Sequence, residues 1–205
     1  MKKFGSAVVL AGGKSLRMGF DKQLIEVNER KIVENIINIL NEEFEEIILV
    51  TNKPQHYISE NYRIVKDQIV GKGPLSGIHI GLKEASSEYV YFIACDMPNI
   101  NIDYIKYMKS KITRLEVDAC ITRFGQWIEP FNSFYSKSLI DSIEENLKMN
   151  KRMINILLED KECCYISEED ARKFSIDWGM FLNLNTKKDL ENYTKDNKMN
   201  IKCLL

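Results

Sequence analysis

The sequence has almost no net charge, and it has few of the prolines and glycines that interrupt helices and strands. Its 29 lysines and arginines nearly balance its 30 aspartates and glutamates, so it lacks the broad positive field on which nucleic-acid and anionic-membrane binding depend. There are only four prolines and ten glycines, and no low-complexity stretch separates one part from another. We therefore expect one domain, residues 1–205, that binds neither nucleic acid nor membrane.

Cysteine spacing and long apolar runs exclude further classes. The count of five is odd and no pair has CxxC spacing, which argues against a zinc site and a disulfide framework. The apolar stretch Ala7 to Ala11 is too short for a secretion signal, and no stretch approaches the roughly 20 residues of a membrane span. These absences predict a cytoplasmic protein with reduced thiols. We expect a monomer or weak oligomer, although no pattern in the sequence indicates the oligomeric state. The five cysteines are Cys95, Cys120, Cys163, Cys164 and Cys203.

What is present is an alternation of strand-like and helix-like segments. Apolar runs of four to six residues, typical of strands buried on both faces, alternate with segments whose apolar residues repeat at i, i+3 and i+4. This order predicts βαβ units and so an α/β fold, a mostly parallel twisted sheet flanked by helices on both faces. The predicted strands are 6–11, 47–51, 63–66 and 89–94, and the predicted helices are 32–40 and one that begins near residue 76.

The second half is less regular. It reads as strands at 119–122 and 131–135, partly antiparallel, and a short strand at 181–185. Helices are expected at 138–147, at 153–158 and from residue 187 onward.

The strongest chemical signal follows the first predicted strand. The stretch from Leu10 to Lys22, LAGGKSLRMGFDK, holds three glycines, two lysines and an arginine. Glycines let the backbone approach a ligand, and Arg17 with Lys22 brings two cations suited to a polyphosphate. The loop is not a Walker motif, which would need glycine where Val8 stands, and it lacks GxGxxG. The alternative is a plain glycine-rich turn with solvated charges.

Two further segments place polar groups at the ends of predicted strands. Asp67 precedes a turn that Gly73 and Pro74 fix, and Ser76 or Gly77 then opens a helix whose N-terminus suits an anion. Asp96 leaves the strand 89–94 just before Pro98, at the sheet edge where an Mg²⁺ bound to substrate phosphates needs an oxygen ligand. The alternative for Asp96 is a helix N-cap.

A fourth segment, FLNLNTKKDL, begins at residue 181. If it is a strand, Asn183 and Asn185 point to the same face and both amides reach one ligand. The alternative is that Thr186 or Asn185 is only the cap of the last helix, a role that both residue types commonly play.

Taken together, these motifs resemble those of the molybdenum cofactor guanylyltransferases, a family of MobA-like nucleotidyltransferases with a Rossmann-like fold. The signature LAGGxSxRMGxDK, the Asp67 and GPLxG pair, Asp96 and the NxNTxxDL ending all match, and the double glycine at 12–13 leans towards guanine in this family. The resemblance covers 7–190 and is loose over 115–177. It implies a nucleotide-binding half, 1–110, and an acceptor-binding half, 111–205. It implies nucleotide contacts from Leu10, Ala11, Gly12, Gly13, Lys22, Asp67, Gly73, Pro74 and Asp96.

The resemblance also implies the reaction and its other residues. GMP would pass from GTP to the terminal phosphate of molybdopterin, with Mg²⁺ on Asp96 and with Arg17, Lys22 and Asp96 as catalytic residues. Asn183, Asn185 and Arg152 would contact the acceptor, and cofactor-synthesis proteins or molybdoenzymes would be transient partners. Three alternatives stay open: a molybdopterin cytidylyltransferase, a corrinoid-phosphate guanylyltransferase and a non-catalytic nucleotide-binding homologue.

The chain departs from the family at one place. Relatives often carry a basic residue, histidine or glutamine before a proline where this chain has Glu129-Pro130, and a glutamate there would repel phosphate unless it faces another group. Lys151-Arg152 matches a basic acceptor-side loop or is the solvated start of a helix. We expect Trp127 and Trp178 to pack or to form a pocket wall.

Overall fold

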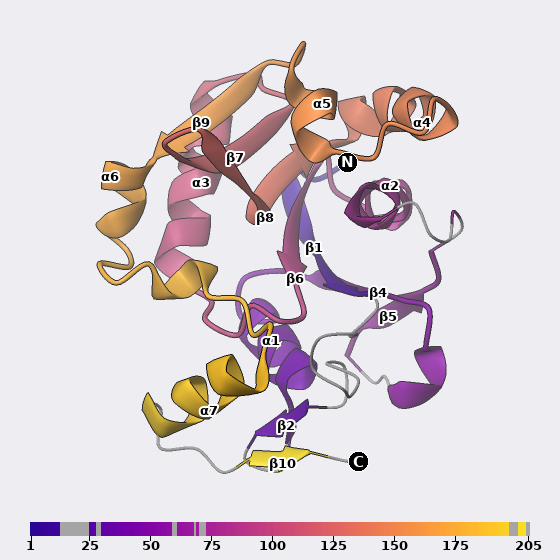
Figure 1. The fold of residues 1–205 in the computed structure, drawn as a ribbon. Helices are drawn as coiled ribbons and strands as arrows, with labels where there is room; N and C mark the ends of the chain where they lie inside the picture. Colours follow the sequence, from indigo (N-terminus) through magenta and orange to yellow (C-terminus); the bar gives the residue numbers. More distant parts are fainter. Residues whose placement is uncertain are drawn as a thin grey trace.

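A computed structural model describes residues 1–12, 25–27, 30–58, 61–67, 69, 73–196 and 201–203 of the chain. Its main element is a seven-stranded sheet in the order β5-β4-β1-β6-β8-β7-β9, which lies between two layers of helices (Figure 1). The sheet strands are β1 (Phe4–Ala11), β4 (Glu46–Thr51), β5 (Arg63–Val65), β6 (Tyr89–Ala94), β7 (Ala119–Phe124), β8 (Trp127–Ser136) and β9 (Cys163–Ser167). The α-helices are α1 (Ile32–Leu40), α2 (Pro74–Glu84), α3 (Ile102–Arg114), α4 (Ile140–Lys148), α5 (Ile154–Leu158), α6 (Glu168–Arg172) and α7 (Lys187–Asp196).

The sheet is mostly parallel, as the alternation of elements predicts. Strands β5, β4, β1 and β6 run parallel to one another, and β7 runs parallel to β9. Only β8 is antiparallel, and it pairs with β6 on one side and β7 on the other. Since β8 is antiparallel to both, β6 and β7 end at the same edge of the sheet.

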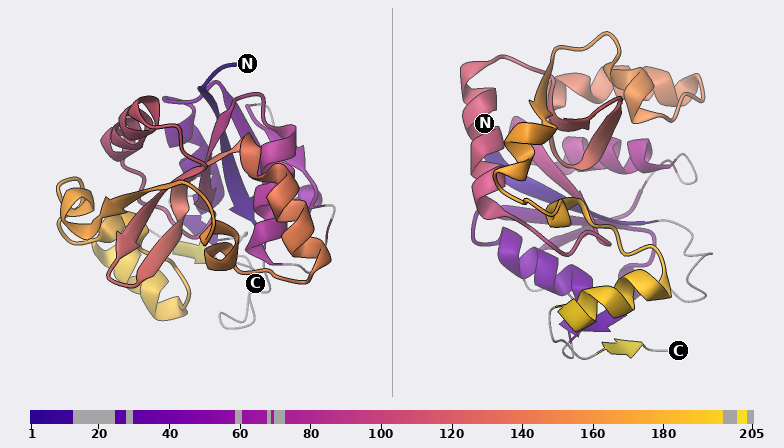
Figure 2. Two further views of the ribbon diagram at one scale, coloured as in Figure 1. Left: turned by 90° about the horizontal axis from the view of Figure 1, so that it is seen from above. Right: turned by 60° about the vertical axis from the view of Figure 1, so that its left-hand side comes forward.

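Each face of the sheet has its own hydrophobic core. One core includes side chains of α1, α3, α6 and α7, and the other those of α2, α4 and α5. Successive residues of β1 alternate between them: Val8 packs in the second core and Val9 in the first. Figure 2 shows the two helical layers on either side of the strands. This explains why β1, β4 and β6 are apolar along most of their length.

Several elements differ from the predictions. The expected strand at 181–185 is wrong: a short 3₁₀ helix, Gly179–Phe181, is followed by irregular backbone that crosses the end of the sheet without joining it. Helix α3, strand β9 and a small second sheet were not predicted. That second sheet has the order β10-β2-β3, with β2 at Ile25–Val27, β3 at Arg30–Lys31 and β10 at Ile201–Cys203.

Four of the cysteines, Cys95, Cys120, Cys163 and Cys164, are free cysteines in the structure. Among the helices of the described ranges, none combines the length and apolarity needed to cross a membrane.

Gly81 marks the closest approach of α2 to the sheet. A Cβ atom at this position would lie 2.6 Å from Cε1 of Phe92 and 3.1 Å from Cγ1 of Val8, and both residues are fully buried. We expect Gly81→Ala to destabilise the protein by about 1–2 kcal/mol in urea unfolding, because overpacking outweighs the helix propensity of alanine. Asn38→Ala, on the exposed side of α1, is the control and should be neutral or slightly stabilising. A Gly81→Ala protein more stable than the wild type would contradict this packing.

Candidate active site

A backbone hydrogen bond links the carboxyl end of β1 to the turn that follows β6. The Cys95 amide donates a hydrogen bond of 3.0 Å to the Leu10 carbonyl, and the Met97 amide donates one of 3.1 Å to the Ala94 carbonyl. These bonds fold residues 95–97 into a turn that holds Asp96, partly buried, over the end of β1. Leu10, Ala11 and Asp96, predicted from separate motifs, therefore lie at one edge of the sheet.

The chain near residue 184 is fastened to this same turn. The Leu184 amide donates a hydrogen bond of 2.9 Å to the main-chain carbonyl of Asp96, and the Leu184 side chain is fully buried. Asn183 and Asn185, on either side of Leu184, are thereby brought beside Asp96. The structure thus joins two motifs that lie almost ninety residues apart in the sequence.

The hydrogen bonds around Asn183, Asn185 and Thr186 show which residue caps α7. Thr186 Oγ1 accepts a hydrogen bond of 3.1 Å from the Asp189 amide, and Asp189 Oδ2 accepts from the amides of Thr186 and Asn185. This reciprocal arrangement is a capping box at the start of α7, with Thr186 as the N-cap residue. Asn183 donates from Nδ2 to the Phe181 carbonyl at 3.0 Å. Thr186 is therefore the cap residue of α7, and the acceptor contacts of Asn183 and Asn185 remain predictions.

Two variants test whether Thr186 is the capping residue and Asn185 an acceptor-binding residue. Thr186→Ala removes the N-cap acceptor of α7 and is expected to cost about 1 kcal/mol of unfolding free energy, with little change in acceptor affinity. Asn185→Ala keeps the cap and is expected to weaken acceptor binding. Its loss of unfolding free energy should be less than half that of Thr186→Ala. Urea unfolding and the KM for the acceptor give the two readouts. The reverse pattern would make Asn185 the structural residue.

Asp67 anchors the turn before α2. Its Oδ2 accepts a hydrogen bond of 2.7 Å from Ser76 Oγ, and its Oδ1 accepts one of 2.9 Å from the Ile69 amide. Gly73, at the N-cap of α2, has φ +79° and ψ −163°, a conformation open to glycine, and Pro74 occupies the first helical turn. Asp67 therefore shapes the turn at the N-terminus of α2. The role of Ser76 as its partner was not predicted, because a separation of nine residues carries no recognisable pattern.

Helix α2 also touches the end of β1. A Cβ atom at Gly77 would lie 3.0 Å from Cδ2 of Leu10, so glycine at 77 lets the first turn of α2 pack on the last residues of that strand. Leu10 is in this way in contact with the first turn of α2, which begins after Gly73 with Pro74. Gly13, Arg17 and Lys22 lie outside the described residues, and their predicted roles rest on the motif.

Arg152 lies on a different element from the asparagines. Its Nε and Nη2 donate to Asn150 Oδ1 at 3.0 and 2.6 Å, in the turn between α4 and α5. Those helices belong to the core on the α2 face, whereas Leu184 belongs to the opposite core. The described contacts hold Arg152 in its own turn, and its predicted acceptor contact remains a prediction.

The donor atoms at this edge suit Mg²⁺. Asp96 contributes a carboxylate and the neighbouring asparagines contribute amide oxygens, all hard ligands of the kind that this ion prefers. Within the described part of the chain, no three histidine, cysteine or acidic side chains gather as a metal cage. Mg²⁺ does not require one, since it usually takes one or two protein carboxylates and completes its shell with phosphate and water. The residues present therefore fit the predicted ion.

A Rossmann-like sheet with a glycine-rich loop after β1 and an aspartate after β6 defines the class of nucleotidyltransferases. The family model for the MobA-like NTP transferase domain matches residues 7–163, and the chain belongs to this family.

Similar proteins agree with this assignment. A probable molybdenum cofactor guanylyltransferase of Peptoclostridium acidaminophilum is 52% identical over 199 residues, which cover 95% of this chain and 90% of the relative. The molybdenum cofactor guanylyltransferase of Syntrophotalea carbinolica is 52% identical over 193 residues, 94% of this chain and 92% of the relative. The crystal structure of molybdopterin-guanine dinucleotide biosynthesis protein A from Archaeoglobus fulgidus has a TM-score of 0.82 at 24% identity. The match covers 94% of this chain and 98% of that one, and it confirms the fold.

Proposed function

We propose that this protein transfers GMP from GTP to the terminal phosphate of molybdopterin and releases pyrophosphate. The observation that carries the proposal is the position of Asp96 in the sheet. Strand β6 separates β1, β4 and β5, which lead to the nucleotide motifs, from β8, β7 and β9 of the acceptor half. This position supports the proposal, because a carboxylate that follows β6 is next to both halves and would reach phosphate groups held between them. The names of the relatives at 52% identity supply the substrates.

The proposed reaction is a direct displacement. An oxygen of the acceptor phosphate attacks the α-phosphorus of GTP, and the bond from that phosphorus to the pyrophosphate oxygen breaks. A phosphate is already ionised near neutral pH, so no side chain has to remove a proton. The work of the protein is positioning and charge neutralisation.

Each group of residues has a part in this positioning. The backbone at Leu10 to Gly12 and the turn at Gly73 hold the nucleotide, while Arg17 and Lys22 hold its phosphates. Asn183 and Asn185 hold the acceptor beside Asp96. Mg²⁺ on Asp96, when bound, would neutralise the negative charge that the two phosphate groups bring together.

The first test measures nucleotide preference. Calorimetric titration with GTP, CTP, ATP and UTP, each with Mg²⁺, is expected to show a clear preference for GTP. Pyrophosphate release from GTP should then depend on added molybdopterin. Preference for CTP would indicate a cytidylyltransferase, and turnover with a corrinoid phosphate but not with molybdopterin would indicate the corrinoid enzyme. Binding without turnover would indicate a non-catalytic homologue.

A further inference from the structure

Strand β8 contains a bulge at the edge of the sheet that carries Asp96. Between the pairs Cys120↔Phe134 and Thr122↔Glu129, β7 advances by two residues and β8 by five, so β8 carries three extra residues. Asn132, within the bulge, has the left-handed φ of +58°. Bulges of this kind commonly redirect a side chain next to an active site.

The bulge is held by side-chain hydrogen bonds and is not a loose loop. Tyr91 donates from its hydroxyl to Asn132 Oδ1 at 2.7 Å, and both residues are buried. Ser133 donates from Oγ to the Glu129 carbonyl at 2.8 Å, and Tyr135 donates from its hydroxyl to the Pro130 carbonyl at 2.7 Å. The position of Glu129 is therefore fixed by the surrounding core.

The register also fixes the face on which Glu129 lies. Glu129 is directly opposite Thr122, whose hydroxyl hydrogen-bonds to Tyr104 of α3, so both side chains are on the α3 face. The preceding residue, Ile128, packs against the opposite core, as alternation requires. This α3 face is also the one on which Leu184 is buried, between Asn183 and Asn185.

The Glu129 carboxylate has no partner among the described residues. It is partly buried, and this burial raises its pKa above the usual range. None of the described side chains or amides donates a hydrogen bond or an ion pair to it. A carboxylate withdrawn from water without a partner is costly to the fold, so a ligand that supplies donors would remove a penalty already present.

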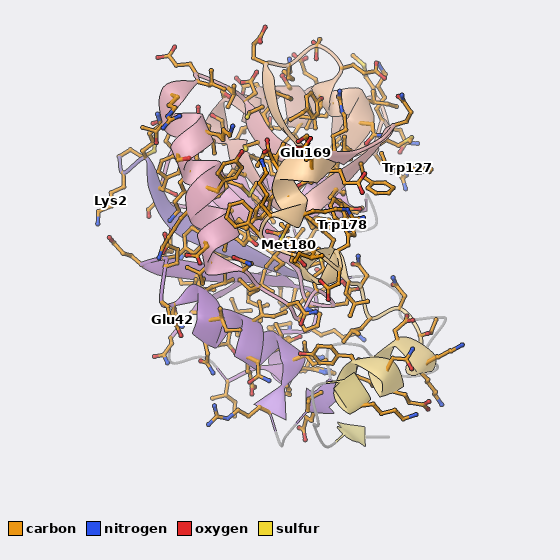
Figure 3. All side chains as sticks on the ribbon, turned by 90° about the vertical axis from the view of Figure 1, so that its left-hand side faces the viewer. Lys2, Glu42, Trp127, Glu169, Trp178 and Met180 are labelled. Carbon is orange, nitrogen blue, oxygen red and sulfur yellow. The ribbon has the colours of Figure 1, made fainter. Side chains whose placement is uncertain are left out.

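Trp127 presents an aromatic surface on the same side. It lies two residues from Glu129, hence about 7 Å along the strand on the same face, and is 74% exposed. Opposite it stands Phe124, whose ring centroid is 5.3 Å from that of Trp178. Figure 3 shows Trp127 projecting outward from the ribbon, on the same side of the molecule as Trp178.

We propose that Glu129 recognises the heterocycle of the acceptor, with its carboxylate accepting from the exocyclic amino group and adjacent ring N–H of the pterin, while Trp127 stacks on the ring. This inference rests on the proposed function, because it takes the acceptor to be a pterin. Two parallel donors match the two oxygens of a carboxylate, and the resulting pair is charge-assisted. A glutamate at this position would repel the phosphate of the acceptor, but here it would contact the pterin at the opposite end of that molecule.

Guanine carries the same pair of donors, so the location decides between the two ligands. Glu129 lies on β8, on the far side of β6 from the nucleotide motifs on β1 and β5. The acceptor asparagines are on the same face of the sheet as Glu129, whereas the turn before α2 is on the other. The arrangement favours the pterin.

The test compares Glu129→Gln with the wild type in pyrophosphate release, with molybdopterin varied at saturating GTP. We expect the KM for molybdopterin to rise about tenfold to a hundredfold, because glutamine offers one acceptor and one clashing donor. The affinity for GTP, measured by calorimetry, should stay within about twofold of the wild type. Glu116→Gln, an exposed neutralisation before β7 at the opposite edge of the sheet, is the matched control and should change neither value.

A second measurement follows Trp127 itself. Trp178→Phe leaves Trp127 as the sole tryptophan, since the chain has two. Molybdopterin should quench its fluorescence, and the quenching should be lost at the same concentrations when Glu129→Gln is added. Unchanged fluorescence in the single variant would overturn the stacking role.

The remaining outcomes are distinct. An unchanged KM for molybdopterin in Glu129→Gln overturns the pairing while leaving the proposed function standing. A loss of GTP affinity in Glu129→Gln overturns pterin recognition and indicates that Glu129 recognises guanine instead. Failure of the wild type to use molybdopterin overturns the proposed function and this inference with it.

Discussion

Replacing Asp96 by asparagine is expected to lower the rate of pyrophosphate release by about a hundredfold or more, with the fold retained. The variant keeps the size of the side chain and removes the charge that would hold Mg²⁺ between the two phosphate groups. The hydrogen bond that fastens residue 184 uses the main-chain carbonyl of Asp96, so the substitution leaves it in place. The loss should therefore appear in kcat and in the dependence on Mg²⁺ rather than in the unfolding curve.

The matched control for Asp96→Asn is Glu88→Gln. Glu88 is exposed and directly precedes β6, so this variant removes a negative charge at the amino end of the strand that Asp96 follows. It should leave turnover unchanged. An Asp96→Asn enzyme with wild-type activity and Mg²⁺ dependence would exclude the metal role for Asp96.

Lys22→Ala is expected to have the second large effect, a loss of about a hundredfold in kcat/KM for GTP. The expectation rests on the motif LAGGKSLRMGFDK, in which a lysine follows the glycine-rich loop after β1. An ammonium group that holds the triphosphate neutralises charge on the departing pyrophosphate, and this contribution grows as the bond breaks. Steady-state kinetics with GTP varied would measure the loss.

Two further variants sharpen the Lys22 experiment. Lys22→Arg keeps the charge and should recover part of the activity, although the planar guanidinium differs in geometry from an ammonium group. Lys148→Ala removes an exposed charge at the end of α4 and should behave as the wild type. Equal activity of Lys22→Ala and Lys148→Ala would mean that Lys22 is a solvated charge.

The central strands and the first helix could be predicted because residues close together in the sequence are enough to indicate them. The runs in β1, β4 and β6 are apolar along their length, and α1 repeats its apolar residues at helical spacing, so neighbours in the sequence suffice. Helix α3 was not predicted, although Tyr104, Met108 and Ile112 repeat at the same spacing and are fully buried. The strand expected at 181–185 was wrong, because alternating apolar and polar residues fit irregular backbone fastened by Leu184 equally well.

The sequence by itself determined the class of fold, and it predicts the chemistry of the site. A glycine-rich segment after the first strand and an aspartate after Tyr89–Ala94 are expected at one edge of the sheet from residue type and strand order, because parallel strands end at one edge. The tertiary structure alone decided which distant residues meet Asp96, since the bond from Leu184 joins segments that no local pattern connects. It also decided the face on which Glu129 lies. Three extra residues in β8 set that face, and a bulge depends on the register of two neighbouring strands rather than on the residues of one.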